Sequence, residues 1–178
     1  MTSTRHGTAV HEYPSELEIL TTRRFDAPLA LVFDVLTNPE HVRHWFAPFE
    51  CEVTECSIDL RVGGSYHIVF VTGEGREMSF RGTYSAVEPP TRTVATWLFE
   101  GWPDAHAEET VELHETDGVT TMTMLLAFRD HAGRDHMTKH DGQEDSYDKL
   151  EDYLRSLLDV REARRTKTSV VWRHSSTG

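Results

Sequence analysis

The sequence predicts an α+β domain: a curved antiparallel sheet of six or seven strands around a long C-terminal helix, with two short helices after the first strand. Three observations support this fold class. A strand-like segment near the N-terminus is followed at once by two helix starts. Apolar and polar residues then alternate over much of residues 49–128, which is the period of strands. Apolar residues finally recur at steps of three and four, and strands followed by such a terminal helix are typical of α+β domains.

The first strand is expected over residues 17–25, where apolar and polar residues alternate. Asp26 and Pro28 follow it and predict the start of a short helix, because Asp can cap a helix and Pro is tolerated in its first turn. Residues 37–39 (Thr-Asn-Pro) repeat this arrangement. They predict a second short helix that ends near Trp45.

The middle of the chain predicts six further strands joined by turns. The strand candidates occupy residues 49–59, 66–70, 78–84, 93–99, 111–113 and 122–128. Pro89 and Pro90 end a strand because neither residue can donate a hydrogen bond to a sheet. Asp117 followed by Gly118 is a strong hairpin signal. Since a long sheet curves to hide its edges, we expect it to enclose a space lined by inward side chains.

The closing helix is predicted over residues 142–158. Its apolar face contains four residues at helical spacing, namely Tyr147, Leu150, Leu154 and Leu157. Acidic residues occupy much of the opposite face, so the apolar face is expected to pack on the sheet.

Charge is distributed unevenly along the chain. The formal net charge is −12, from 18 basic and 30 acidic residues. Residues 161–178 carry a net charge of +4, so the rest of the chain, with 13 basic and 29 acidic residues, carries −16. Such an acidic body would be repelled by phosphate backbones, which excludes nucleic acid as a partner. We expect a flexible leader at 1–15, one domain at 16–160 and a solvated basic tail at 161–178.

The sequence predicts a cytoplasmic protein without a membrane span. No apolar run approaches the roughly 20 residues that a transmembrane helix needs, and residues 1–15 lack the apolar core of a secretory signal. Cys51 and Cys56 are five residues apart and would point to opposite faces of a strand. They are therefore expected to be free thiols in a reducing compartment.

No catalytic or metal-binding motif is evident, and we predict no catalytic residue, no metal and no cofactor. GxSxG, P-loop and GxGxxG motifs are absent. The histidine pairs His41/His44 and His136/His140 have helical spacing, but no matching carboxylate accompanies them. Six polar side chains could still point inward, although most should face water; these are Glu50, Glu52, Asp59, His67, Arg81 and Glu100.

Several motifs, in order, resemble a known family. They are "TTRRFDAPLALVFDVLTNPEHVRHWFAP", "DLRVGGSYHIVF", "FRGTYSAVEPPTRTVATWLFEG", "TVELHETDGVTTMTMLLAF" and "KHDGQEDSYDKLEDYL". Together they cover roughly residues 16–160 and resemble the SRPBCC superfamily, in particular the bacterial single-domain branch named for the activator of heat-shock-protein-90 ATPase. The family often has a tryptophan after the glycine that opens the closing helix, where this chain has Gln143 after Gly142. The resemblance implies a helix-grip (START-like) fold with an internal cavity for hydrophobic or amphipathic small molecules.

Aromatic and methionine side chains on the inward face are the candidate ligand-binding residues. They are Trp45, Tyr66, Ile68, Phe80, Tyr84, Trp97, Phe99, Met122, Met124, Tyr147 and Leu150. Gly82 lies between Phe80 and Tyr84 on the same face and is expected to leave a gap that a ligand can approach. A cavity lined by aromatic rings with a few hydroxyl groups is typical of small-molecule sites. The alternative is that these residues form only a packed core.

Three functions remain open at this point. The first is binding of a hydrophobic or aromatic small molecule, for transport, sensing or sequestration, by a monomer or homodimer. The second is an enzyme similar to the cyclase and dehydratase relatives of the superfamily. The third is a co-chaperone-like activator of a heat-shock-protein ATPase, although the eukaryotic activators use a further domain for which this chain has little room. An inward polar group with a shifted pKa would favour the second function, and an exposed patch would favour the third.

Overall fold

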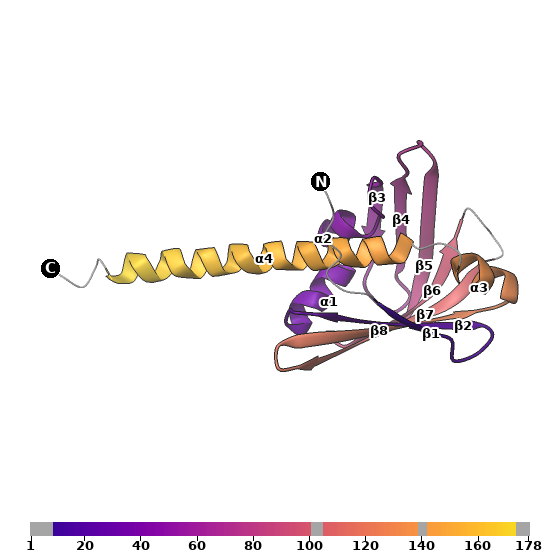
Figure 1. The fold of residues 1–178 in the computed structure, drawn as a ribbon, viewed down its shortest axis with the longest axis horizontal. Helices are drawn as coiled ribbons and strands as arrows, with labels where there is room; N and C mark the ends of the chain where they lie inside the picture. Colours follow the sequence, from indigo (N-terminus) through magenta and orange to yellow (C-terminus); the bar gives the residue numbers. More distant parts are fainter. Residues whose placement is uncertain (1–8, 101–104, 139–141, 174–178) are drawn as a thin grey trace.

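The computed structural model describes residues 9–100, 105–138 and 142–173 (Figure 1). The strands are β1 (Val10–Glu12), β2 (Glu18–Phe25), β3 (Glu52–Ile58), β4 (Ser65–Val71), β5 (Glu77–Glu88), β6 (Arg92–Phe99), β7 (His106–Thr116) and β8 (Val119–Phe128). The helices are α1 (Leu29–Thr37), α2 (Pro39–Trp45), α3 (His131–Thr138) and α4 (Gly142–Arg173). The predicted α+β class and the order of its main elements are confirmed.

The strands form one antiparallel sheet in the order β1-β2-β8-β7-β6-β5-β4-β3. β3 to β8 are a meander, and β2 joins it by pairing with β8, from Glu18 opposite Ala127 to Phe25 opposite Thr120. Figure 1 shows the sheet curving strongly around the first half of α4, with α1 and α2 beside the helix. The curved sheet gripping a C-terminal helix is therefore confirmed.

The sheet has one strand more than the upper limit of the prediction, because β1 lies within residues 1–15, where a flexible leader was expected. Val10 pairs with Thr22 and Glu12 with Leu20 in an antiparallel register. The His11 Nδ1 also lies 3.0 Å from the Thr21 hydroxyl. All three residues of β1 are exposed, so backbone pairing holds this strand, and no hydrophobic alternation reveals it.

The two short helices begin as predicted, although the first is capped differently. Asn38 accepts a hydrogen bond from the Glu40 backbone N–H at 3.1 Å and caps α2. The N-cap position of α1 is Pro28 and has no side-chain cap, so the capping role predicted for Asp26 is wrong. The carboxylate of Glu115 supplies the missing acceptor, since the Leu29 backbone N–H donates to it at 2.7 Å.

Two helical features were not predicted. α3 was missed because it has only eight residues and contains Gly133, which disfavours helix. α4 continues 15 residues beyond the predicted end at Leu158, to Arg173, and Figure 1 shows this second half projecting away from the sheet. Residues 159–165 lack an apolar face, but they contain neither Gly nor Pro and several good helix formers, which lets the helix continue.

Arg23 anchors α4 to the sheet. Its guanidinium donates to Glu144 at 3.0 Å, Asp148 at 2.8 Å and Glu151 at 2.9 Å, three residues on successive turns of the helix. The side chains of Arg23 and Asp148 are 2% and 0% exposed. This buried network holds the cavity-facing part of α4 in place against β2.

Candidate functional site

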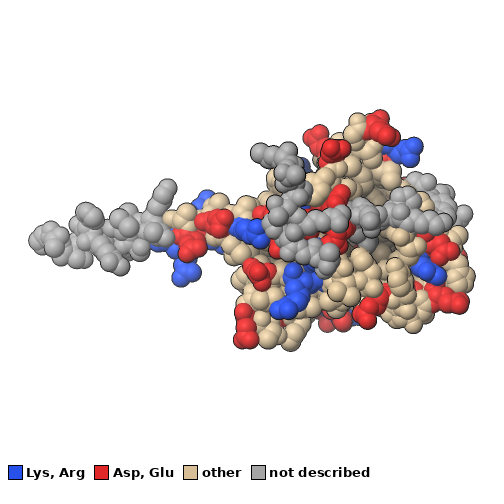
Figure 2. Space-filling model, viewed as in Figure 1, with Lys and Arg blue, Asp and Glu red and all other residues tan. Residues whose placement is uncertain are grey.

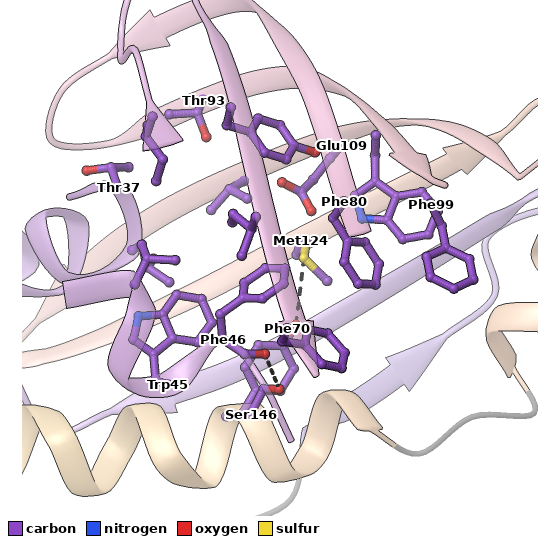
Figure 3. A pocket seen from close by; sticks show the side chains of 18 of the residues that line it. Thr37, Trp45, Phe46, Phe70, Phe80, Thr93, Phe99, Glu109, Met124 and Ser146 are labelled. Carbon is purple, nitrogen blue, oxygen red and sulfur yellow. Dashed lines mark hydrogen bonds between the residues drawn. The ribbon is translucent and has the colours of Figure 1, made fainter. Parts of the chain in front are cut away.

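The sheet, α1, α2, α3 and α4 surround a partly open cavity of about 740 Å³. Its wall consists mostly of aromatic and aliphatic side chains, several of which are drawn in Figure 3. Exposed Arg76 and Glu77, beside the β4–β5 turn, and half-buried His136, on α3, lie among the lining residues. The volume falls within the range of small-molecule sites, about 300–1,000 Å³.

Most of the predicted site residues do line this cavity. They are Trp45, Tyr66, Ile68, Phe80, Tyr84, Trp97, Phe99, Met124 and Tyr147. Strand alternation placed the sheet residues on the inward face correctly. Their role in binding a ligand stays a prediction.

Met122 and Leu150 do not line the cavity. They are 1% and 0% exposed and belong to the core that joins the sheet to the helices. Alternation and helical spacing identify an inward face, but they do not show where along that face other side chains already fill the space.

The aromatic rings of the cavity wall gather around Phe80. Its ring centroid lies 5.0 Å from that of Phe99 and 5.6 Å from that of Trp97. Phe46, which follows α2, packs edge-on against Phe80 at 5.5 Å. Phe46 and Phe70 also line the cavity, although neither was among the predicted site residues. These contacts fall within the 4.5–7 Å range of favourable aromatic pairs.

Three tyrosines bring hydroxyl groups to the same space. The Tyr66 hydroxyl donates to the Thr96 carbonyl at 3.2 Å, and the Tyr147 hydroxyl lies 3.6 Å from the Met124 sulfur. The Tyr84 ring lies 5.8 Å from that of Tyr66. Burial, and then the nearby Glu109 carboxyl, raises the pKa of all three phenols, so they remain neutral.

Glu109 on β7 is the cavity residue that the sequence analysis missed. Figure 3 shows its carboxyl pointing into the cavity, and burial raises its pKa to about 7. The side chain is partly accessible because it faces the hollow interior. A signal for it existed: Ala107 and Leu113, at even spacing from Glu109, are buried inward residues of the same strand.

Gly82 does not provide the gap expected from the sequence. A Cβ atom there would lie 1.8 Å from the Thr96 carbonyl oxygen and 2.5 Å from the Tyr66 ring. The neighbouring strand and Tyr66 therefore fill the space beside Gly82. The glycine allows the close approach of β6, where the Thr83 backbone N–H donates to the Thr96 hydroxyl at 2.9 Å.

The polar candidates His67 on β4, Arg81 on β5 and Glu100, which directly follows β6, do not line the cavity. The two ring nitrogens of His67 lie 3.0 Å from Glu55 and 2.8 Å from the Ser79 hydroxyl. Ser79 also donates to Glu100, and Arg81 pairs with Glu100 at 2.6 Å. This chain of contacts resembles a Ser-His-acid arrangement, but its residues do not line the cavity, and the Ser79 hydroxyl is committed to Glu100. Glu50, Glu52 and Asp59 do not line the cavity either.

The histidines of the first candidate pair, His41 and His44, have partners other than a metal. His41 lies 2.8 Å from the Tyr153 hydroxyl and 3.3 Å from Asp34, and His44 stacks on the Tyr153 ring at 4.8 Å. His140 lies outside the described residues. Within the described ranges, no group of three or more His, Cys, Asp or Glu residues could hold a metal ion. Both cysteines are free thiols, as predicted.

None of the helices in the described ranges combines the length and the hydrophobicity needed to cross a membrane.

The curved sheet, the gripped helix and the enclosed cavity together define a helix-grip domain. The chain belongs to the family described as "Activator of Hsp90 ATPase homolog 1-like protein", whose model matches residues 26–155. The resemblance stated from the sequence is thus confirmed. No curated protein matches the chain.

Solved structures agree on the fold. Protein NE0264 from Nitrosomonas europaea has 25% identity and a TM-score of 0.72, over 83% of this chain and 99% of that chain. The Q3J4M4_RHOS4 protein from Rhodobacter sphaeroides has 22% identity and a TM-score of 0.78, over 83% and 98%. CalU16 from Micromonospora echinospora has 22% identity and a TM-score of 0.53, over 88% of each chain. The latter two similarities concern the fold alone.

Proposed function

We propose that the protein binds a hydrophobic or aromatic small molecule in its internal cavity. The observation that carries this proposal is the cavity of about 740 Å³ with a mostly aromatic and aliphatic wall. Protein interiors are normally close-packed, and a cavity of this size is therefore expected to bind a molecule. Such binding would serve transport, sensing or sequestration of the molecule.

The proposal is tested with N-phenyl-1-naphthylamine, an apolar probe whose fluorescence rises in apolar surroundings. Native mass spectrometry of the purified protein gives a second readout, because a retained small molecule adds its mass to the chain. Val111→Trp would fill part of the cavity, since Val111 lines it. Val62→Trp is the matched control, because Val62 is 62% exposed and does not line the cavity.

We expect the wild type and Val62→Trp to take up the probe and Val111→Trp to lose most of this uptake. A wild type that takes up no probe and retains no molecule would contradict the proposal. In that case Val111→Trp should also cost the ~1–3 kcal/mol typical of overpacking a dense core.

A second candidate function is an enzyme that transfers a proton to or from a bound ligand. The observation that favours it is the Glu109 carboxyl, since a buried acid with a pKa of about 7 is suited to general acid–base catalysis at neutral pH. Chemical conversion of a retained ligand by the wild type, and its loss in Glu109→Gln, would favour the enzyme over simple binding.

A co-chaperone-like function has less support. The exposed large apolar side chains in the described part of the chain are Val10, Tyr13, Val62 and Val160, which lie in three separate parts of the fold. Apolar partner surfaces are usually contiguous.

A further inference from the structure

The Glu109 carboxyl differs from the other acidic group that lines the cavity. Glu77 is exposed beside the β4–β5 turn, whereas Glu109 is the fourth residue of β7 and lies between two strands, opposite Ala95 on β6 and Leu126 on β8. The nearest inward positions of β7 carry the apolar residues Ala107, Val111 and Leu113.

Glu109 has no hydrogen-bond or ion-pair partner among the described residues, although the other buried charges are paired. Arg23, for comparison, makes three ion pairs with α4. Burying an unpaired carboxylate is costly unless a partner compensates it. In this cavity the compensating group can come from a bound molecule.

The surroundings of the carboxyl favour a cation as that partner. Phe80, Trp97 and Tyr66 line the same cavity, and the faces of aromatic rings attract cations. The whole chain has a net charge of −12, and Figure 2 shows acidic side chains around the edges of the body on the face drawn there. An acidic protein concentrates cationic ligands near its surface.

We propose that Glu109 recognises the protonated amine of an amphipathic ligand whose apolar body occupies the rest of the cavity. The inference rests on the proposed function and names its ligand class: a hydrophobic or aromatic amine. The ammonium group donates a charge-assisted hydrogen bond to the carboxylate, which is stronger than a bond between neutral groups.

Binding of this kind is linked to protons. Tyr66 on β4, Tyr84 on β5 and Tyr147 on α4 interact electrostatically with Glu109, and all three stay neutral because burial raises their pKa. The other charged or titratable side chains of the cavity wall are Cys51, Arg76, Glu77, Arg92 and His136. Adjacent positions of β6 and β8 carry the apolar residues Ala95 and Leu126. Glu109, with a pKa of about 7, then loses its proton near neutral pH when a cation binds beside it.

The experiment compares three probes that share one ring system: 1-naphthylmethylamine, 1-naphthalenemethanol and 1-naphthoic acid. Affinities are measured by isothermal titration calorimetry with the full chain, in two buffers of different ionisation heat to count protons. Glu109→Gln removes the charge and keeps the shape. Glu108→Gln is the matched control, because Glu108 is the exposed neighbour on the opposite face of β7.

In the wild type and in Glu108→Gln we expect the amine to bind about ten-fold or more tightly than the alcohol, as a charge-assisted bond allows. The acid should bind most weakly. The preference for the amine should disappear in Glu109→Gln. Amine binding should release about half a proton at pH 7, and the release should fall towards zero above pH 8.

Equal binding of amine and alcohol to the wild type would overturn this inference and leave the proposed function intact. Absence of binding by all three probes would contradict both. If Glu109→Gln does not fold, proton release by the wild type decides the matter: none at pH 7 overturns the inference.

Discussion

Replacing Arg23 with methionine should destabilise the protein strongly, because it removes the buried cation that three carboxylates share. Met keeps much of the aliphatic volume, so the substitution removes charge more than packing. Arg23 lies 2.8–3.0 Å from Glu144, Asp148 and Glu151, and its side chain is 2% exposed. Removing one partner of such a buried pair typically costs ~3–5 kcal/mol.

The expected loss converts into a measurable shift. For a chain of this size, ~1 kcal/mol corresponds to ~2–4 °C in the midpoint of thermal unfolding. Arg23→Met should therefore unfold roughly 6–20 °C below the wild type. Circular dichroism during heating measures the shift, and urea unfolding gives the free energy directly.

Arg24→Met is the matched control, since Arg24 is the next residue of β2 and faces solvent. Exposed substitutions usually change stability by less than ~0.5 kcal/mol. If Arg23→Met and Arg24→Met differ by less than ~1 kcal/mol, the network does not anchor α4, and the reasoning from burial and geometry is refuted.

Four further predictions follow from the same structure. Gly82→Ala should lower the free energy of unfolding by at least the ~1–3 kcal/mol of ordinary overpacking, because its Cβ would clash with the Thr96 backbone; urea unfolding close to wild type would contradict this. The stability of Glu109→Gln relative to the wild type should rise by up to about 3 kcal/mol between pH 4 and pH 8. The raised pKa of about 7 means that the folded wild type binds more protons than its unfolded chain, so the wild type loses stability between about pH 4.5 and 7. A stability difference that does not change with pH would exclude this. Deleting residues 166–178 should change the unfolding midpoint by only a few degrees, and a large loss would show that this segment is structural. Chelation followed by dialysis should leave the midpoint unchanged, and a fall that zinc reverses would reveal a metal site.

Much of the sheet could be predicted because its strands follow simple rules. Alternation on β4, β6 and β8 placed Tyr66, Trp97 and Met124 on the inward face, and Asp117 with Gly118 forms the predicted turn, both residues having positive φ (52° and 79°). These features depend on residues close together in the sequence. Local patterns are therefore enough to reveal them.

The features that were missed depend on distant parts of the chain. In the sequence, Arg23 is indistinguishable from its neighbour Arg24 as a strand arginine. Only the fold shows that the acidic residues of α4, more than 120 positions later, lie beside it. Gly82 was predicted to leave a gap, because the sequence does not show that the Thr96 carbonyl occupies the space beside it. Glu109 could have been assigned to the inward face by its spacing from Ala107, but its place in a hollow part of the interior could not.

The pairing of β2 with β8 has a consequence for the synthesis of the chain. β2 contains residues 18–25, but its partner in the sheet ends at residue 128, and the partners of Arg23 follow it by 121 to 128 residues. Contacts so distant in sequence form slowly, because a long loop must first close. During translation β2 therefore has only β1 as a possible sheet partner until β8, near the end of the domain, has left the ribosome. The apolar concave face of the meander stays uncovered for the same period, until α4 is made and closes over it.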